Sequence, residues 1–368
     1  MSIQRTTGAE PAVPTAVPVA VGPGPVARGR SFALVFVALM ITMLLSSMDQ
    51  TVFSTALPTI VGELHGIDQQ LWVTTGYMLA STIMMPIYGR LGDAIGRKWL
   101  FATAIGVFVL GSVLGGLSTN MVGLIAARAV QGLGGGGLII LSQAIIADIV
   151  PAATRGRYLG LMGAVFGVSS VVGPLLGGWF AEGPGWRWAF WINVPLGLLA
   201  IAAVVLWLHL PARSQRVRID LAGIATMALA VMALVLVTSL GGNTFAWTSP
   251  EILGLAAVFV GFATVFVVVE RHAAQPIIPL QLFRERNFHL ATIGSLVVAI
   301  CMFGAISYLP TFLQMSVGLN ATLAGLMMVP MVAGMALTST VSGNIASITG
   351  TSRKEQIRAG HALPSPRQ

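Results

Sequence analysis

Charge is what this sequence lacks most. Of its 368 residues only 9% are Asp, Glu, Lys or Arg, whereas 55% are hydrophobic and the mean hydropathy is +0.86. A soluble globular chain of this length needs a far larger charged and polar surface. The composition therefore excludes a soluble protein and predicts an all-α polytopic membrane protein.

Cysteine and catalytic clusters are scarce as well. The single cysteine, Cys301, excludes an intrachain disulfide and offers no metal-ligand spacing, and we expect it to be a packed thiol in an apolar run. The five histidines are scattered over expected loops and helix ends, and no Ser/His/Asp set or phosphate-binding loop is found. We therefore expect no enzyme, no metal and no cofactor.

The positions of the basic residues indicate which loops lie on the cytoplasmic side. The formal net charge is +8, but the 20 basic residues are spread over short loops and form no stripe that would bind nucleic acid. If the N-terminal tail is cytoplasmic, 18 of them fall on the cytoplasmic side, leaving Arg187 outside and Arg128 within a helix. Both termini are expected in the cytoplasm. Ten apolar runs could each span a bilayer, at 32–55, 71–91, 99–118, 122–146, 158–181, 188–208, 219–240, 251–270, 290–310 and 323–346.

A glycine-rich, charged turn, Gly89 to Lys98, joins the second and third of these runs. Its glycines allow a tight reversal and close helix approach, Asp93 can cap a helix or pair with a cation, and the basic residues hold the turn in the cytoplasm. An ordinary positive-inside loop would need the basic residues but not the Gly and Asp spacing. The turn resembles the signature loop of the major facilitator superfamily, Gly-x-Leu-Ala-Asp-Arg-x-Gly-Arg-Lys, with Ala94 where a basic residue is usual. The residues carried over from this gating loop are Gly89, Asp93, Gly96, Arg97 and Lys98.

An acid lies inside the first run. Asp49 is six residues from the expected outer end of its helix, hence about 9 Å below it. It is either an interfacial or helix-capping acid that water reaches, or part of a membrane pathway, which we favour. The stretch from Asp49 to Pro58 resembles the Leu-Asp-x-Thr-Val-Val-Asn-x-Ala-Leu-Pro motif of the fourteen-helix drug:proton antiporters, with Ser54 where Asn is usual.

The fourth run holds a basic residue at a similar depth. Arg128 shares a helix face with Gln131 and Gly132, and it also lies about 9 Å below the outer end. An intramembrane arginine needs a partner, so we predict that Arg128 and Asp49 face a common cavity; the alternative is that Arg128 snorkels to the outer surface. The stretch resembles the Arg-x-x-Gln-Gly motif of the superfamily, whose arginine is associated with proton coupling.

Glycine is abundant in this fourth run, from Gly134 to Gly137. Together with Gly132 the run satisfies G-x-G-x-x-G, but no strand precedes it, so a dinucleotide site is rejected. We expect another helix to approach closely at this point.

The fifth run carries one face of small residues. Its members recur at helical spacing, so a neighbouring helix can lie on the face, and Pro174 predicts a bend. The face consists of Gly160, Gly163, Gly167, Ser170, Pro174 and Gly177. Its end, Gly-Pro-x-x-Gly-Gly, is similar to the antiporter motif found in exporters. The residues carried over from that motif are Gly163, Gly167, Gly173, Pro174, Gly177 and Gly178.

The remaining order of segments favours the fourteen-helix branch. The stretch Trp186 to Gly197 matches the Trp-Arg-Trp-x-Phe-x-x-Asn-x-Pro pattern of the family, and only a short basic loop then precedes two extra spans. The Gly343 to Gly350 spacing repeats that of Gly89 to Gly96, and a polar tail follows where the repeat would place four more helices. The expected parts are a disordered tail at 1–30, a six-helix bundle at 31–210, two linker helices at 211–272, two helices of an incomplete second bundle at 273–350, and a polar tail at 351–368.

The resemblance implies a proton-driven exporter of lipophilic small molecules with a major facilitator fold, in which about ten of fourteen helices are present. Protonation of Asp49 would weaken its pairing with Arg128 and bias the outward- to inward-facing equilibrium. The expected partners are a small lipophilic substrate, protons and the lipid bilayer, and the Arg-rich composition suggests a bacterial cell (inner) membrane; the oligomeric state stays open. Two alternatives remain, an importer on the same scaffold and a non-transporting fragment of such a transporter.

Overall fold

The computed structural model describes residues 30–210, 220–273 and 285–318, together with Ile277 and single positions between 323 and 341. The expected tails, apart from Arg30, lie outside the described residues, as do the basic loop at 211–218, the repeat at Gly343 to Gly350 and most of the expected helix 323–346.

Within the described residues every regular element is helical, apart from one isolated bridge in the loop after α8. Seven helices are long and apolar enough to cross a membrane. The all-α, multi-pass prediction is confirmed. The helices are α1 (Arg30–Leu64), α2 (Gln70–Ile95), α3 (Arg97–Gly116), α4 (Met121–Ile149), α5 (Ala152–Glu182), α6 (Trp188–Trp191), α7 (Asn193–Trp207), α8 (Leu221–Leu240), α9 (Pro250–His272) and α10 (Arg286–Ser316), with a short 3₁₀ turn (Ile67–Gln69) before α2.

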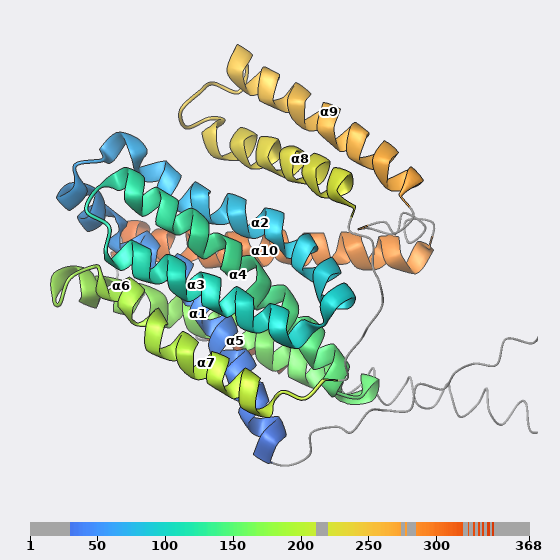
Figure 1. The fold of residues 1–368 in the computed structure, drawn as a ribbon. Coiled ribbons are helices and arrows are strands. Elements are labelled where there is room, and N and C mark those ends of the chain that lie inside the picture. The colour runs from blue at the N-terminus through green and yellow to red at the C-terminus, as the bar shows by residue number, and fades with distance from the viewer. Residues whose placement is uncertain are drawn as a thin grey trace, which may run out of the picture.

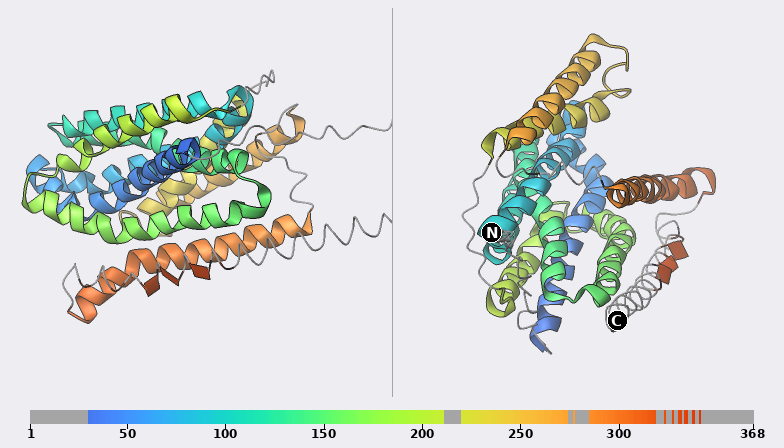
Figure 2. Two further views of the ribbon diagram at one scale, coloured as in Figure 1. Left: turned by 90° about the horizontal axis from the view of Figure 1, so that it is seen from below. Right: turned by 90° about the vertical axis from the view of Figure 1, so that its right-hand side faces the viewer.

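The helices from α1 to α7 pack into one bundle (Figure 1). Helix α4 lies against both α2 and α3, α1 lies against α5 and α7, and α3 lies against α7. Helices α8 and α9 form an antiparallel pair, of which α8 contacts α2. Figure 2 shows α10 outside this bundle, on the side away from α3 and α7. The first seven helices therefore form the body in which a site can be enclosed.

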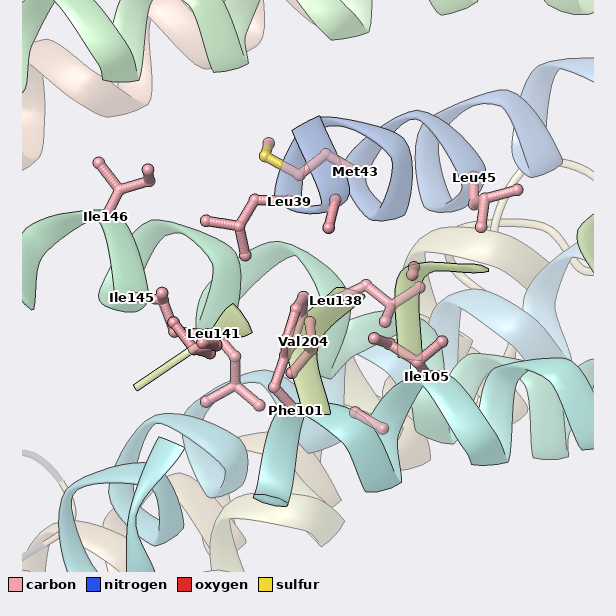
Figure 3. Close-up of a cluster of buried hydrophobic side chains, with 14 of the residues drawn as sticks. Leu39, Met43, Leu45, Phe101, Ile105, Leu138, Leu141, Ile145, Ile146 and Val204 are labelled. Carbon is pink, nitrogen blue, oxygen red and sulfur yellow. The ribbon is translucent and has the colours of Figure 1, made fainter. Parts of the chain in front are cut away.

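The core of the bundle lies where α1, α3, α4 and α7 meet (Figure 3). The buried side chains there are aliphatic or phenyl groups, among them Leu39 and Met43 of α1, Phe101 of α3, Leu138 of α4 and Val204 of α7. Because lipid tails are as apolar as these residues, close packing and internal polar contacts, rather than water exclusion, hold such helices together.

The glycine run of α4 permits that close packing on two sides. A Cβ at Gly136 would overlap the carbonyl oxygen of Ser81 on α2, and one at Gly134 would overlap the backbone nitrogen of Phe108 on α3. The expected close approach is confirmed, and the run serves two helices rather than one.

Several expected helix ends are wrong. Helix α1 continues nine residues past its expected end at 55, because Leu57, Ile60 and Val61 are buried in an outer hydrophobic cluster that stabilises the extra turns. Helix α5 starts at Ala152 rather than 158, and α10 spans 286–316 rather than 290–310.

Two further expectations need correction. The expected helix 188–208 is one apolar span, Trp188–Trp207, with a break at Ile192 between α6 and α7; Pro195 in the first turn of α7 has no N–H to continue the preceding turn. Cys301, expected to be packed, is exposed on α10, which lies outside the bundle.

Candidate functional site

The centre of the bundle holds a buried ion pair. Asp49 of α1 and Arg128 of α4 are joined through Oδ2 and Nη1, and the two side chains are 0% and 1% exposed. The sequence-based pairing is confirmed, and the alternative in which Arg128 reaches the outer surface is wrong. The two side chains are enclosed by protein rather than facing a cavity.

Asp49 lies farther from the end of its helix than the sequence predicts. Because α1 ends at Leu64, Asp49 is 15 residues from the helix end, which corresponds to about 22 Å rather than 9 Å. The pairing was predicted correctly because an intramembrane charge needs a partner, not because the two depths agreed.

Gln131 bridges both members of the pair. Its Nε2 donates to Asp49 Oδ1 at 2.7 Å, and its Oε1 accepts from Arg128 Nη1 at 2.7 Å. Gln131 and Arg128 are three residues apart on α4, so they share one face of that helix. The NH₂ group of the amide therefore binds Asp49, and its oxygen binds Arg128.

Two residues that the sequence reasoning did not assign to the site complete it. Ser112 of α3 accepts hydrogen bonds from Gln131 Nε2 at 2.9 Å and from Asn193 Nδ2 of α7 at 3.2 Å. Asn193 also donates to Asp49 Oδ1 at 3.4 Å. The motif that contains Asn193 was noted in the sequence, but no spacing within α7 or α3 could reveal that these residues face α1.

Arg128 is also held between two aromatic rings. Its Cζ lies 4.3 Å from the centroid of the Phe53 ring and 4.4 Å from that of Tyr77, and its Nε donates to the Val73 carbonyl at 3.4 Å. A cation desolvated between ring faces is stabilised by their quadrupoles. The hydroxyl of Tyr77 pairs in turn with Ser46 Oγ at 3.2 Å. The arginine is thus fixed by a carboxylate, an amide, a carbonyl and two rings.

The net charge of the site depends on the protonation state of Asp49. A carboxylate buried beside one cation forms a pair without net charge, and adding one proton leaves the site with an uncompensated positive charge. In the described part of the chain no cluster of three or more His, Cys, Asp or Glu residues could hold a metal ion.

The charged turn predicted from the sequence joins α2 and α3. Arg97 Nη2 contacts Asp93 Oδ1 at 2.5 Å, its Nη1 contacts Asp148 Oδ2 at 2.7 Å, and it donates to the Ala144 carbonyl at 2.7 Å. Lys98 Nζ donates to the Val205 carbonyl at 2.9 Å. The turn is therefore tied to the ends of α4 and α7.

The three glycines of this turn are not equivalent. Gly96 has φ +97°, which permits the reversal between α2 and α3. A Cβ at Gly92 would lie 3.0 Å from Leu141 Cδ2, so this glycine allows α4 to approach. At Gly89 the nearest atom, Ile140 Cγ1, would lie at an ordinary 4.0 Å, and the expected close approach there is wrong.

The small-residue face expected on α5 is only partly used. A Cβ at Gly173 would overlap Thr51 Oγ1 of α1, and one at Gly177 would lie 2.6 Å from the Val52 carbonyl oxygen. At Gly163 and Gly178 no atom would lie within 4 Å. Gly160 and Gly167 are buried, and α5 is one continuous helix through Pro174.

The small-residue face of α5 is only partly used because α1 crosses α5 along a different row of residues. Thr51 Oγ1 donates to the Ser169 carbonyl at 3.0 Å, so the contact follows Ser169, Gly173 and Gly177 rather than the expected row, with which it shares only Gly177.

On α4, Gly132 does lie in close contact, because a Cβ there would overlap the Tyr77 carbonyl oxygen.

Comparison with known proteins identifies the scaffold. A model of the family described as the Major Facilitator Superfamily matches residues 39–363. The chain belongs to the major facilitator superfamily. Relatives include an uncharacterized MFS-type transporter of Mycobacterium tuberculosis, 41% identical over 346 residues, which are 93% of this chain and 50% of that protein. The multidrug transporter protein MdtP of Bacillus subtilis is 37% identical over 327 residues, 89% of this chain and 60% of that protein.

Solved structures agree on the fold. The human organic anion transporter MFSD10 superposes with a TM-score of 0.54 at 14% identity, covering 86% of this chain and 73% of that one. The proton:xylose symporter XylE gives a TM-score of 0.52 at 14% identity, covering 85% of this chain and 69% of that one. The major facilitator fold is confirmed, and the chain spans about half to three fifths of the length of the curated relatives named above.

Proposed function

We propose that this chain, a multi-pass membrane protein of a transporter family, exports lipophilic small molecules in exchange for protons. The observation that carries the proposal is the buried Asp49–Arg128 pair, bridged by Gln131. Protonation of Asp49 would remove the charge that holds Arg128 and so change the packing of α1 against α4. A proton gradient would then supply the energy, with no cofactor.

Export of lipophilic compounds rests on two further points. Curated relatives carry the names multidrug transporter protein and multidrug resistance protein, both in Bacillus subtilis. The Gly173 and Gly177 contacts place the antiporter-like stretch of α5 against α1, the helix that carries Asp49. We infer a small lipophilic substrate, residence in a bacterial cell membrane with cytoplasmic termini, and the division into a bundle at 31–210, linker helices at 211–272 and a second part from 273 onward.

The test is dye movement in proteoliposomes. An imposed proton gradient is expected to drive a fluorescent lipophilic cation against its own gradient, and Asp49→Asn should abolish this movement because the amide cannot take up the proton. Asp68→Asn, the same change at an exposed residue between α1 and α2, is the control and should transport normally. Proton-driven dye movement that survives in Asp49→Asn would refute the coupling role of Asp49. Dye movement in the same direction as the protons would favour the importer.

A further inference from the structure

The hydrogen bonds around Asp49 all run in one direction. In the described residues its carboxylate oxygens accept from Arg128 Nη1, Gln131 Nε2 and Asn193 Nδ2. A carboxylate only accepts, whereas a carboxylic acid must donate its own proton to an acceptor. The observed arrangement therefore fits the deprotonated acid, and proton binding requires a neighbour to turn an acceptor toward Asp49.

Gln131 and Asn193 each carry such an acceptor, the carbonyl oxygen of the amide. Both amides, however, direct their NH₂ groups at Ser112 Oγ, at 2.9 and 3.2 Å. Ser112 donates its own hydrogen to the Phe108 carbonyl at 3.0 Å, so its oxygen is left to accept. Ser112 therefore helps to hold the NH₂ group of both amides toward Asp49, together with Arg128 Nη1, which donates to Gln131 Oε1, and the Ala189 carbonyl, which accepts from Asn193 Nδ2 at 3.4 Å.

Rotation of the Gln131 amide would have a second effect. Its Oε1 now accepts from Arg128 Nη1 at 2.7 Å, so after rotation the NH₂ group would face the guanidinium, donor against donor. The bond from Gln131 to Arg128 would be lost in the same movement that gives Asp49 an acceptor. Proton uptake at Asp49 and release of Arg128 are then one event.

We propose that Ser112 is a positioning residue that sets the orientation of the Gln131 and Asn193 amides and thereby sets how readily Asp49 takes up a proton. The proposal rests on the proton-coupled function given above. In the step itself one proton from water binds Asp49 Oδ1, the new O–H donates to Gln131 Oε1, and the charge of the site rises by one.

No other charged group of the described residues is placed to take over this role. Arg128 of α4 and Tyr77 of α2 are the charged and titratable groups that face Asp49. Helix α3 presents Ser112 and α7 presents Asn193. Helix α5 meets α1 through the Ser169 carbonyl and its glycines and, more than three turns from Asp49 along α1, through the ring of Tyr158 against Phe32 and Phe36.

The experiment is infrared difference spectroscopy during a pH titration of the 368-residue chain in lipid vesicles. The carbonyl band that is missing in Asp49→Asn reports the protonated acid, and its pH midpoint is compared between variants. Without the serine hydroxyl each amide loses one of the bonds that hold its NH₂ group toward Asp49, so Ser112→Ala should raise the midpoint by about 0.5 to 1 pH unit, as the loss of one hydrogen bond implies.

Ser142→Ala is the matched control. Ser142 is an equally buried serine on α4 whose hydroxyl pairs with Thr42 Oγ1 at 3.4 Å, away from the site. Its midpoint should equal that of the parent chain. Ser112→Cys, which keeps the size but accepts weakly, should fall between the parent and Ser112→Ala, and Asn193→Leu should also raise the midpoint.

The outcomes separate the two proposals. If Ser112→Ala and Ser142→Ala share the parent's midpoint, the positioning role of Ser112 is refuted while proton binding at Asp49 stands. If the parent shows no Asp49 band at any pH, proton coupling through Asp49 and the role of Ser112 are both refuted. Should Ser112→Ala fold poorly, Ser112→Cys decides the question: a midpoint above that of the parent supports the positioning role of Ser112, and a midpoint equal to that of the parent refutes it.

Discussion

Arg128 is buried, so its charge must be stabilised by protein groups rather than by water. The pairing with Asp49 neutralises its charge, while the rings of Phe53 and Tyr77 both lie close to the guanidinium. A flat, delocalised cation can occupy such a slot and still reach an amide and a carbonyl. A lysine could supply the positive charge, but its ammonium group could not make hydrogen bonds in the same directions.

The pair predicts strongly non-additive mutations. Arg128→Met leaves Asp49 as a lone buried charge and should destabilise the protein by about 3 kcal/mol or more. Adding Asp49→Asn removes that charge, so the double variant should be more stable than Arg128→Met alone. The measurement is the thermal unfolding midpoint in detergent for the parent, both single variants and the double variant. Losses that simply add would show that the two side chains do not interact.

At the scale of the helix, close contacts decide which substitutions each helix tolerates. The α1 to α5 crossing passes over Gly173 and Gly177, whereas Gly163 and Gly178 of the same helix meet no atom within 4 Å. Glycine therefore has a packing role at some of these positions and none at others, although all look alike in the sequence.

Two adjacent glycines of α5 should respond oppositely to alanine. Gly177→Ala places a methyl group 2.6 Å from the Val52 carbonyl oxygen and should destabilise by about 1–3 kcal/mol. Gly178→Ala enters open space and should be neutral or stabilising by up to about 1 kcal/mol. Thermal unfolding of the two variants checks this directly. Equal losses in both would mean that α1 does not cross α5 at Gly177.

The C-terminal end of α1 is bound to the segment before α6. Glu63 accepts from Arg187 Nη1 at 2.6 Å and from Trp186 Nε1 at 2.7 Å, and Arg187 also donates to the Ser118 carbonyl at 3.2 Å. The hydrogen bonds from Arg187 and Trp186 hold the pKa of Glu63 below its ordinary value. This contact helps to explain why α1 extends beyond its expected end.

The Glu63 contact predicts a pH-dependent contribution to stability. A depressed pKa in the folded state means that the contribution is fully present above the unfolded-state pKa, about 4.3, and is lost as the pH falls through the lower folded value. Glu63→Gln should therefore unfold at a lower temperature than the parent at pH 7 by a small margin, since the pair is half exposed. The margin should disappear in strong acid, and a margin that persists there would contradict the ionic origin of the contact.

At the scale of the whole molecule, the sequence was sufficient for the class, the order of the described helices and the central pair. Asp49 and Arg128 could be matched because charges inside a membrane are rare and need partners. Ser112 and Asn193 could not, since polar residues of this size are common in apolar helices and only the packing of α3 and α7 against α1 reveals their role. The end of α1 depends on tertiary contacts for the same reason.

The distribution of basic residues predicts the orientation of the whole bundle, which labelling can test. In a Cys301→Ser background, Thr244→Cys introduces a thiol into the exposed loop between α8 and α9, and Thr154→Cys introduces one at the exposed start of α5. The orientation that puts 18 of the 20 basic residues inside predicts that the loop at Thr244 is outside and Thr154 inside. A membrane-impermeant maleimide should label Thr244→Cys in intact cells and Thr154→Cys only after permeabilisation. The reverse pattern would invert the bundle, and proton entry to Asp49 would then have to be assigned to the other side of the membrane.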